Sequence, residues 1–419
     1  MPRRMDKPGP RPIVSAMTHD SDILIAGGGL NGPVLALALA HAGFSVTLVD
    51  ATPPTKDAGD FDGRAYAIAA GSRRMLARLG LWAPLAAKAQ AMTEIKVTDG
   101  RAGDGPAPWW LHFDSAEIED GPMGHMVEDR HLRAALDAAL EAAEDVTRRA
   151  PETVVAQEVT PGGVSVTLGS GEVLRAGLLV GCDGRASGTA ARAGIRRHGW
   201  GYGQTAITCA VEHALPHHGI AHQFFMPGGP LAILPLTGNR SSLVWSERTE
   251  RAERIAALDD AGFLAALRPA FGGFLGEIDL VGARGLFPLG LSLAERLTGP
   301  RVALVGDAAH GLHPVAGQGL NAGLRDVAAL AQVLREARQR GEDTGSAQVL
   351  ERYARWRRFD TATLAATTDL TTRLFSNDNP LLRLARDAGM GAINAIAPLR
   401  RAMIREAAGL TGELPELMR

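Results

Sequence analysis

The chain has 419 residues, of which 46% are hydrophobic and 21% are charged, and its net charge is −2 at pH 7. This balance describes a soluble globular protein and excludes a disordered chain or one that binds nucleic acid through a basic surface. The two cysteines, Cys182 and Cys209, are far apart and in no metal-ligand spacing, so we expect no disulfide framework, no metal and a reducing cytoplasm.

The beginning of the chain carries no targeting pattern. Residues 1–20 are basic but contain no apolar core, so we expect a disordered leader and not a signal peptide. The sequence has no uninterrupted apolar run long enough to span a bilayer.

A complete βαβ unit follows the leader. The apolar run 23–26 is typical of a buried parallel strand, 34–42 forms a helical run ended by Gly43, and 45–49 predicts a second strand. Between the first strand and the helix, three glycines have the G-x-G-x-x-G spacing, which 50 glycines in this chain would produce by chance about 0.7 times. The strand, the helix and Asp50 after the second strand make the pattern meaningful and predict a dinucleotide site. This unit alone leaves both NAD and FAD open.

Each residue of that loop has an expected task. Gly27 makes the tight turn, Gly29 lets backbone N–H groups approach a pyrophosphate, and Gly32 lets the helix pack closely on the strand. Phosphate is attracted by the N-terminus of the helix, and Asp50 accepts hydrogen bonds from a ribose hydroxyl.

Helical and strand patterns alternate through the rest of the chain. Helical spacing occurs at 72–82 and 128–143, strands are expected at 94–99, 109–114 and 177–184, and a β-meander is expected from 154 to 174. Strand patterns dominate 204–284 around one helix near 251–267, a buried strand begins at 301, and helices fill the remainder. The predicted fold class is α/β: a Rossmann-like domain of parallel sheet plus β-meander, an inserted β-rich domain, and C-terminal helices.

Two further sites distinguish FAD from NAD. Asp183 and Gly184 end one apolar strand, while Gly306 and Asp307 end another, and a second glycine-rich loop at 317–321 opens a helix. Ligands bind at the carboxyl ends of parallel strands, and a helix N-terminus attracts electron-rich groups. A nicotinamide enzyme does not need three such sites on one domain, whereas an extended FAD does.

These motifs carry a family resemblance. The first glycine loop, "DGR" at 62–64, "GCDG" at 181–184 and "GDAAHGLHPVAGQGLNAGLRD" at 306–326 resemble the para-hydroxybenzoate-hydroxylase superfamily of FAD monooxygenases. Within that superfamily, 64–82 and the tail at 373–390 and 407–415 are similar to the ubiquinone-biosynthesis hydroxylases. The resemblance spans about 22–415, and it departs from the usual pattern at Cys182, where the family has alanine, and at His313, where many members have proline.

The resemblance implies a set of cofactor-binding residues but names no catalytic base. They are Gly27, Gly29, Gly32 and Asp50 for the ADP half of FAD, Arg64 and Arg130 along the cofactor, Asp183 and Gly184 for FAD and NAD(P)H, Asp307 at the ribityl–pyrophosphate region, and Pro314, Gly317, Gln318, Gly319, Leu320 and Asn321 around the isoalloxazine.

The chemistry implied is hydroxylation of the aromatic ring of a polyprenylated phenol in ubiquinone biosynthesis. NAD(P)H reduces the FAD, molecular oxygen adds as a C4a-hydroperoxyflavin, and the distal oxygen passes to the ring. Other ubiquinone-biosynthesis proteins are the partners implied, and the expected location is the cytoplasm, with peripheral contact with the inner membrane left open. A hydroxylase of a soluble aromatic compound, a non-catalytic flavin-binding assembly subunit and an NAD-dependent dehydrogenase are the alternatives.

The expected domain limits follow from the motifs. The FAD-binding domain comprises 21–93, 126–196 and 286–345, the substrate domain 94–125 and 197–285, and the C-terminal helical region 346–419.

Several residues that invite a functional role have simpler expected roles. For His213, His217, His218 and His222 we expect a solvated loop and not a metal site. We expect His310 to satisfy local backbone groups, Cys182 to act as a small buried hydrophobe, and Trp109 and Trp110 to line the core or a substrate wall. The C-terminal segment 379–409 is expected to be a helix pair packed on the FAD domain, with contact to a membrane surface as the alternative.

Overall fold

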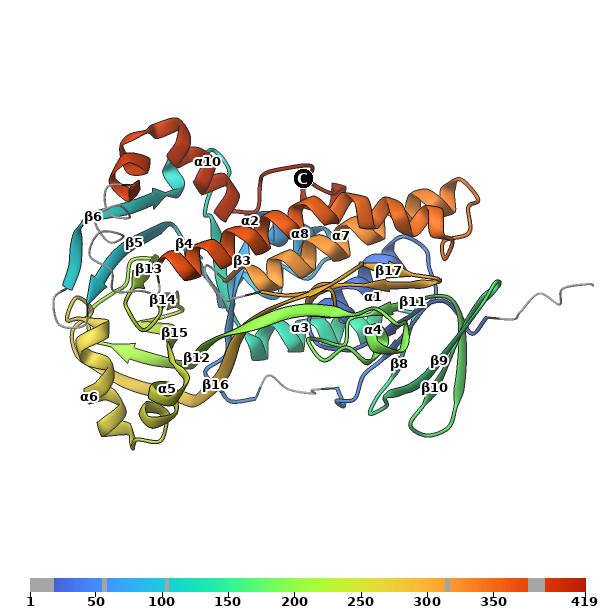
Figure 1. Cartoon of the computed structure of the whole chain (residues 1–419), viewed down its shortest axis with the longest axis horizontal. Coiled ribbons are helices and arrows are strands. Elements are labelled where there is room, and N and C mark those ends of the chain that lie inside the picture. The colour runs from blue at the N-terminus through green and yellow to red at the C-terminus, as the bar shows by residue number, and fades with distance from the viewer. Residues whose placement is uncertain (1–18, 55–58, 102–104, 313–316, 376–388) are drawn as a thin grey trace, which may run out of the picture.

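A computed structural model describes residues 19–54, 59–101, 105–312, 317–375 and 389–419 of the chain, and it arranges them in three sheets with helices packed against them (Figure 1). Almost all of the expected leader lies outside these ranges. In Figure 1 the first sheet lies to the right and the second to the left, and α7 (Gln318–Gln339) and α8 (Ala347–Phe375) run side by side above them.

The first sheet has eight strands in the order β17-β18-β11-β1-β2-β8, with β10 and β9 attached to β11. Its strands are β1 (Ser21–Ala26), β2 (Val46–Val49), β8 (Val146–Arg149), β9 (Val154–Thr160), β10 (Gly163–Leu168), β11 (Val173–Gly181), β17 (Thr298–Gly299) and β18 (Val302–Leu304). The neighbours β8, β2, β1, β11 and β18 are parallel, and Ala26 pairs with both Val49 and Gly181. The carboxyl ends of four strands therefore meet at one edge, because Gly181 in turn pairs with Leu304.

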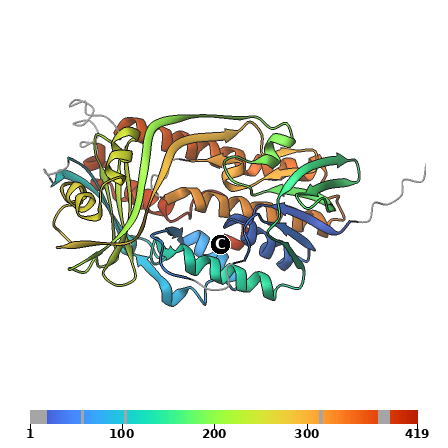
Figure 2. The same cartoon turned by 90° about the horizontal axis from the view of Figure 1, so that it is seen from below.

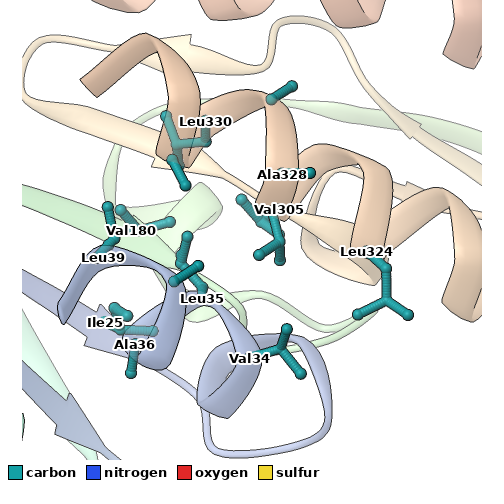
Figure 3. Close-up of a cluster of buried hydrophobic side chains, with 14 of the residues drawn as sticks. Ile25, Val34, Leu35, Ala36, Leu39, Val180, Val305, Leu324, Ala328 and Leu330 are labelled. Carbon is teal, nitrogen blue, oxygen red and sulfur yellow. The ribbon is translucent and has the colours of Figure 1, made fainter. Parts of the chain in front are cut away.

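Both faces of this sheet are covered, as the continuous apolar strands require. Alternate residues of β1 enter different clusters: Ile23 and Ile25 pack beneath α1 (Asn31–His41) and α7, whereas Leu24 and Ala26 pack against the β9–β10 side. Figure 3 shows side chains of α1 and α7 meeting over Ile25 and Val180. Full burial of each large aliphatic side chain contributes about 1.5–3 kcal/mol, so this double-sided packing holds the strand ends in fixed positions.

The second sheet has the order β19-β16-β12-β15-β14-β13-β5-β6. Its strands are β5 (Glu94–Arg101), β6 (Gly105–Asp114), β12 (Arg197–His213), β13 (Ile220–Phe225), β14 (Leu231–Leu236), β15 (Arg240–Arg248), β16 (Ile278–Ala294) and β19 (His310–Gly311). The long strands β12 and β16 belong to the second sheet and extend from it to the side of the first sheet (Figure 2). Strand β16 continues through residues 285–286, where we expected the substrate domain to end and the FAD-binding domain to resume. The expected domain limits therefore stay a prediction.

The outer face of the second sheet is covered by two helices. We expected one helix near 251–267, and this was wrong: α5 (Thr249–Ala256) and α6 (Asp260–Phe271) are separate. The side chain of Asp259 accepts a hydrogen bond from the N–H of Gly262 and so caps a new helix start.

A small third sheet joins the two larger ones. It has the order β3-β7-β4, with β3 (Ala65–Ala69), β7 (Gly124–Glu128) and β4 (Ala89–Met92), and α2 (Ala70–Arg78) and α3 (Asp129–Ala142) follow two of these strands directly. Short 3-10 turns are η1 (Ala86–Lys88), η2 (Ser115–Glu117), η3 (Gly306–Ala308) and η5 (Glu416–Met418). Two further helices are α4 (Gly188–Arg192) and α10 (Ala397–Ala407), and residues 389–395 are also helical.

These elements confirm the predicted fold class. The C-terminal helix α10 touches both expected domains: its Ile404 lies in one cluster with Leu111 and Phe113 of β6 and with Ala70 of α2, which belongs to the expected FAD-binding domain. Of the helix pair expected at 379–409, residues 379–388 lie outside the described residues, while 389–395 are helical and precede α10.

Candidate functional site

A cavity of about 450 Å³ opens at the edge where the parallel strands end. It is lined by Gly27, Gly28, Gly29, Asp50, Glu152, Cys182, Asp183, Gly184, Gly188 and Arg192, among others. Five of the predicted site residues are therefore brought together: Gly27, Gly29, Asp50, Asp183 and Gly184.

The first glycine loop has the geometry that a phosphate cradle requires. Gly27 has a φ of 108°, and a Cβ added there would lie 2.4 Å from the carbonyl oxygen of Cys182. A Cβ at Gly32 would lie 1.9 Å from the carbonyl oxygen of Gly27, so α1 rests directly on the turn. By contrast, nothing lies within 4 Å of a Cβ at Gly29, whose backbone faces the cavity.

The N-terminus of α1 is electrostatically free for an anion. No side chain caps it, and its first turn contains no acidic residue. No side chain of its own first turn therefore neutralises the partial positive charge of the helix end, which suits a pyrophosphate in this cavity.

Asp50 stands at the end of β2 on the rim of the cavity. Its Oδ1 accepts a hydrogen bond from the N–H of Thr52 at 3.1 Å, and its Oδ2 lies 3.5 Å from Nη2 of Arg148. The carboxylate lies against Gly28, where a Cβ would come within 2.2 Å of it. Gly28 therefore leaves room for the acid, a role that the spacing of the motif did not reveal.

Asp183 organises the turn after β11. Its Oδ1 accepts from the hydroxyl of Ser187 at 2.5 Å and its Oδ2 accepts from the N–H of Thr189 at 2.8 Å. Beside it, burial and the charge of Asp183 raise the pKa of the Cys182 thiol well above its ordinary value. The thiol thus stays protonated and packs as an apolar group at the edge of the core beneath α1.

The turn after β18 presents Asp307. Its carboxylate Oδ2 lies 3.2 Å from Nε of Arg185, and both side chains are nearly half exposed. Arg197 donates from Nη2 to the backbone oxygen of Asp307 at 3.0 Å and from Nη1 to that of Ala308. The backbone of this turn is thus fixed, while the carboxylate remains accessible.

The second glycine loop lies against β3. Gly317 has a φ of 62° and precedes α7, whose first turn has neither an acidic residue nor a side-chain cap. Asn321 of α7 accepts from the N–H of Ala69 at 2.9 Å and donates to the carbonyl oxygens of Ala67 at 2.8 Å and Gly317 at 3.1 Å. The side-chain amide of Asn321 therefore anchors the loop to β3. Pro314, which was expected beside this loop, lies outside the described residues.

Arg64, just before β3, and Arg130, at the start of α3, are engaged in ion pairs. Arg64 contacts Asp62 at 2.7 Å and Asp129 at 3.0 Å, and Arg130 contacts Glu128 at 2.7 Å. Neither arginine lines the described cavity.

The carboxylate of Glu128 also joins two sheets. Glu128 is 2% exposed and pairs with Arg240 of β15 at 2.7 Å, as well as with Arg130. The guanidinium groups of Arg240 and Arg130 lie 5.4 Å and 5.8 Å from the ring centre of Phe61.

The sequence did not indicate two of these arginines. Arg240 has no local motif around it, and Arg185 was missed although it directly follows the Asp183–Gly184 pair.

The histidine cluster departs from expectation, because two of its members are not solvated. His213 is 4% exposed and His217 is 9% exposed, and their rings hydrogen-bond to Leu215, Ser241, Leu236 and Gly238. Burial lowers the pKa of His222 to about 4. Among the described residues, no three histidine, cysteine or acidic side chains gather as metal ligands.

Two other simple expectations also need correction. His310 bonds the carboxylate of Asp326 and not local backbone. Trp110 is 41% exposed on β6, where it stacks on His112, so the core placement was wrong, and the substrate-wall alternative stays a prediction. The side chain of Trp109 is not among those described. Within the described ranges, no helix is both long and apolar enough to cross a membrane.

Comparison with known proteins assigns the class. A family model described as "FAD binding domain" matches residues 20–367. The solved structure of p-nitrophenol 4-monooxygenase PnpA from Pseudomonas putida is 20% identical, with a TM-score of 0.78 over 95% of this chain and all of the other, which establishes the shared fold. The family model thus makes the chain an FAD-binding protein, and the structural similarity gives its fold.

Curated relatives narrow this class. The chain is 45% identical to "Ubiquinone hydroxylase UbiL" of Rhodospirillum rubrum, over 97% of this chain and 95% of the relative. It is 37% identical to "3-demethoxyubiquinol 3-hydroxylase" of Escherichia coli, over 93% and 99% respectively. The chain therefore belongs to the ubiquinone-biosynthesis hydroxylase family, within the para-hydroxybenzoate-hydroxylase superfamily of flavin monooxygenases. FAD is its cofactor, which excludes the NAD-dependent dehydrogenase, and NAD(P)H and molecular oxygen are the family's co-substrates.

Proposed function

We propose that this enzyme hydroxylates the aromatic ring of a polyprenylated phenol in ubiquinone biosynthesis. The observation that carries the proposal is the near full-length similarity to the Rhodospirillum rubrum ubiquinone hydroxylase. The similarity covers the second sheet as well as the FAD-binding motifs, and the second sheet is where we place the substrate. The name of that relative favours a polyprenylated substrate over a soluble aromatic compound.

The FAD would lie along the edge of the parallel sheet. We place its adenosine ribose at Asp50, its pyrophosphate at Gly27–Gly29 and the N-terminus of α1, and its ribityl chain at Asp307. The open space above Gly29 and the accessible carboxylate of Asp307 support this placement. When reduced by NAD(P)H, the flavin activates molecular oxygen for insertion into an aromatic ring.

The residues of the chain orient and shield this chemistry. We place the isoalloxazine at the uncapped N-terminus of α7, which stabilises negative charge on an electron-rich ring. Asn321 anchors this helix end to β3, so the dipole is held in a fixed direction. Arg64, Arg130 and Glu128 brace the neighbouring strand β7 and helix α3, and Glu128 links them to the second sheet through Arg240.

Isotope labelling of the purified enzyme tests this function. A polyprenylated phenol is incubated with the FAD-loaded enzyme and NAD(P)H under ¹⁸O₂, and the product is analysed by mass spectrometry. We expect incorporation of one ¹⁸O atom and none from labelled water. Oxidation of NAD(P)H without labelled product would leave the assembly-subunit alternative standing, and labelling of a short-chain phenol alone would favour the soluble-substrate alternative.

We also propose that the C-terminal region contacts the membrane that holds such a substrate. Ile396 and Leu399 at the start of α10 are 51% and 43% exposed, and Arg401 and Arg405 of the same helix are exposed as well. A helix that exposes both apolar side chains and arginines favours binding at an anionic lipid surface. Replacing both Ile396 and Leu399 by serine should weaken co-sedimentation with phosphatidylglycerol vesicles, whereas Leu215→Ser, which alters another exposed leucine, should not. Unchanged binding of the double variant would refute this contact.

A further inference from the structure

One buried carboxylate ties down both ends of the turn that carries Asp307. Asp326 of α7 is 1% exposed, and its Oδ2 accepts hydrogen bonds from the N–H of Gly306 at 3.0 Å and from Nε2 of His310 at 2.6 Å. Gly306 is the first residue of the η3 turn, and His310 lies two residues beyond the end of that turn. The turn is thereby fastened to α7 on both sides of Asp307.

A second helix holds the carboxylate in place. Arg357 of α8 is 2% exposed; its Nε donates to Oδ1 of Asp326 at 2.7 Å and its Nη1 donates to Asp360 at 2.6 Å. One turn earlier on α8, the hydroxyl of Tyr353 donates to the carbonyl oxygen of Leu304 at 2.8 Å, at the end of β18. Burial would raise the pKa of Asp326, but its contacts with His310 and Arg357 lower it to about 2, so the carboxylate is ionised at neutral pH.

A buried ion pair is by itself weak evidence that charges are needed here for stability. A buried ion pair costs much of its attraction in lost hydration, and apolar residues of similar size often stabilise a fold equally well. What this arrangement provides is direction: Asp326 of α7 receives three donors, two from the turn at 306–310 and one from α8, and so it fixes the turn relative to α7 and α8. The exposed carboxylate of Asp307 depends on that turn for its position, because its one described side-chain partner, Arg185, is itself nearly half exposed.

We propose that Asp326 and Arg357 are positioning residues that hold the Asp307 turn in the geometry that binds the ribityl region of FAD. This inference rests on the placement of FAD proposed above. Neither residue touches the cofactor in this account; both act through the backbone of residues 306–310. Their contribution should therefore be confined to the part of the ligand that reaches Asp307.

Comparing FAD with ADP as ligands of the apoprotein tests this proposal. ADP reports only on the Gly27–Gly29 end of the site, whereas FAD also reaches Asp307. Flavin fluorescence quenching measures FAD binding, and competition against FAD measures ADP binding. For Arg357→Met we expect FAD affinity to fall at least tenfold and ADP affinity to change less than twofold. Arg357→Lys keeps a positive charge beside Asp326, so its FAD affinity should be intermediate, and this variant decides the question if Arg357→Met does not fold.

Arg301→Met is the matched control. Arg301 is also buried, at 9% exposure, and is also paired with a carboxylate, that of Asp343, but it lies at the opposite end of β18. We expect it to leave the affinities for both ligands unchanged even if the protein becomes less stable.

A double-mutant cycle then shows whether Arg357 acts through Asp307. In an Asp307→Asn background, Arg357→Met should weaken FAD binding less than twofold further, because the contact it positions is already lost. Parallel losses of FAD and ADP affinity, unchanged FAD affinity, or full additivity with Asp307→Asn would each overturn the proposal. The wild-type protein is titrated first: if it binds neither ligand, the proposed cofactor site itself fails.

Discussion

Alanine substitutions at Gly29 and Gly32 should separate cofactor binding from folding. A Cβ at Gly29 meets nothing within 4 Å and projects where we place the pyrophosphate, whereas a Cβ at Gly32 would lie 1.9 Å from the carbonyl oxygen of Gly27. Gly29→Ala should therefore fold normally and lose FAD, while Gly32→Ala should lose both stability and FAD. Gly162→Ala, in the turn between β9 and β10, also meets nothing within 4 Å and should lose neither.

The size of each effect follows from these distances. Side-chain carbons essentially never approach closer than 3.0 Å, so in Gly32→Ala helix α1 must retreat by roughly 1 Å from the turn. Overpacking of this kind costs about 1–3 kcal/mol, only partly offset by the better helix propensity of alanine. For Gly29→Ala we expect a change in unfolding free energy within about 0.5 kcal/mol and at least a tenfold loss of FAD affinity, equivalent to about 1.4 kcal/mol.

Two measurements on each variant suffice. Urea denaturation of the apoprotein gives the free energy of unfolding, and flavin fluorescence gives the FAD dissociation constant. The reasoning is refuted if Gly29→Ala retains full FAD affinity, because the cavity would then not hold the pyrophosphate. It is equally refuted if Gly32→Ala matches Gly162→Ala in stability.

Three further predictions concern the frame around the site. Glu128→Gln removes the charge that pairs with Arg130 and Arg240, and it should lower the free energy of unfolding by about 1–3 kcal/mol in urea denaturation. The control is Glu172→Gln, whose exposed carboxylate lies 3.7 Å from Arg149 and whose loss should leave the free energy of unfolding unchanged. Equal effects of the two substitutions would contradict a bracing role for Glu128. Phe263→Ala leaves a cavity at a fully buried position beside Trp245 and should lower the free energy of unfolding by about 3–5 kcal/mol. The FAD dissociation constant of the folded protein should not change. A weakened FAD affinity would mean that this core supports the cofactor site. For His222 the folded pKa of about 4 lies below the ordinary 6.5, so the unfolded chain takes up the proton first and stability is lost as pH falls from 6.5 to 4. His222→Phe, which stays in contact distance of Phe274, should reduce this loss by on the order of 1–3 kcal/mol in denaturation curves at pH 7 and pH 4.5, and an unchanged pH dependence would contradict burial as its cause.

The sequence predicted the first βαβ unit well because every local signal agreed. The apolar strand, the glycine loop, the helix and Asp50 are contiguous, and each depends on neighbours within a few residues in the chain. The break between α5 and α6 was also local, since Asp259 is a typical N-cap residue, but the apolar spacing around it concealed the cap.

What the sequence could not predict depends on contacts between distant segments. Arg185 and Arg197 contact Asp307, which is more than a hundred residues away in the chain. The side-chain amide of Asn321 accepts a hydrogen bond from Ala69 of β3, 252 residues away. The turn-rich composition predicted a solvated histidine loop. His213 and His217 are nevertheless buried, because their rings form hydrogen bonds with backbone and hydroxyl groups of neighbouring strands and turns. Partners of this kind become visible only once the strands are paired.

The central claim concerns the substrate, and mass spectrometry of the quinone lipids from a strain lacking this gene tests it most directly. The account predicts loss of ubiquinone with accumulation of a prenylphenol that lacks one hydroxyl-derived oxygen, restored by the wild-type gene and not by Gly29→Ala. The structure of the accumulated intermediate would also identify the ring position. An unchanged quinone pool in a strain with no second enzyme of this family would contradict the account.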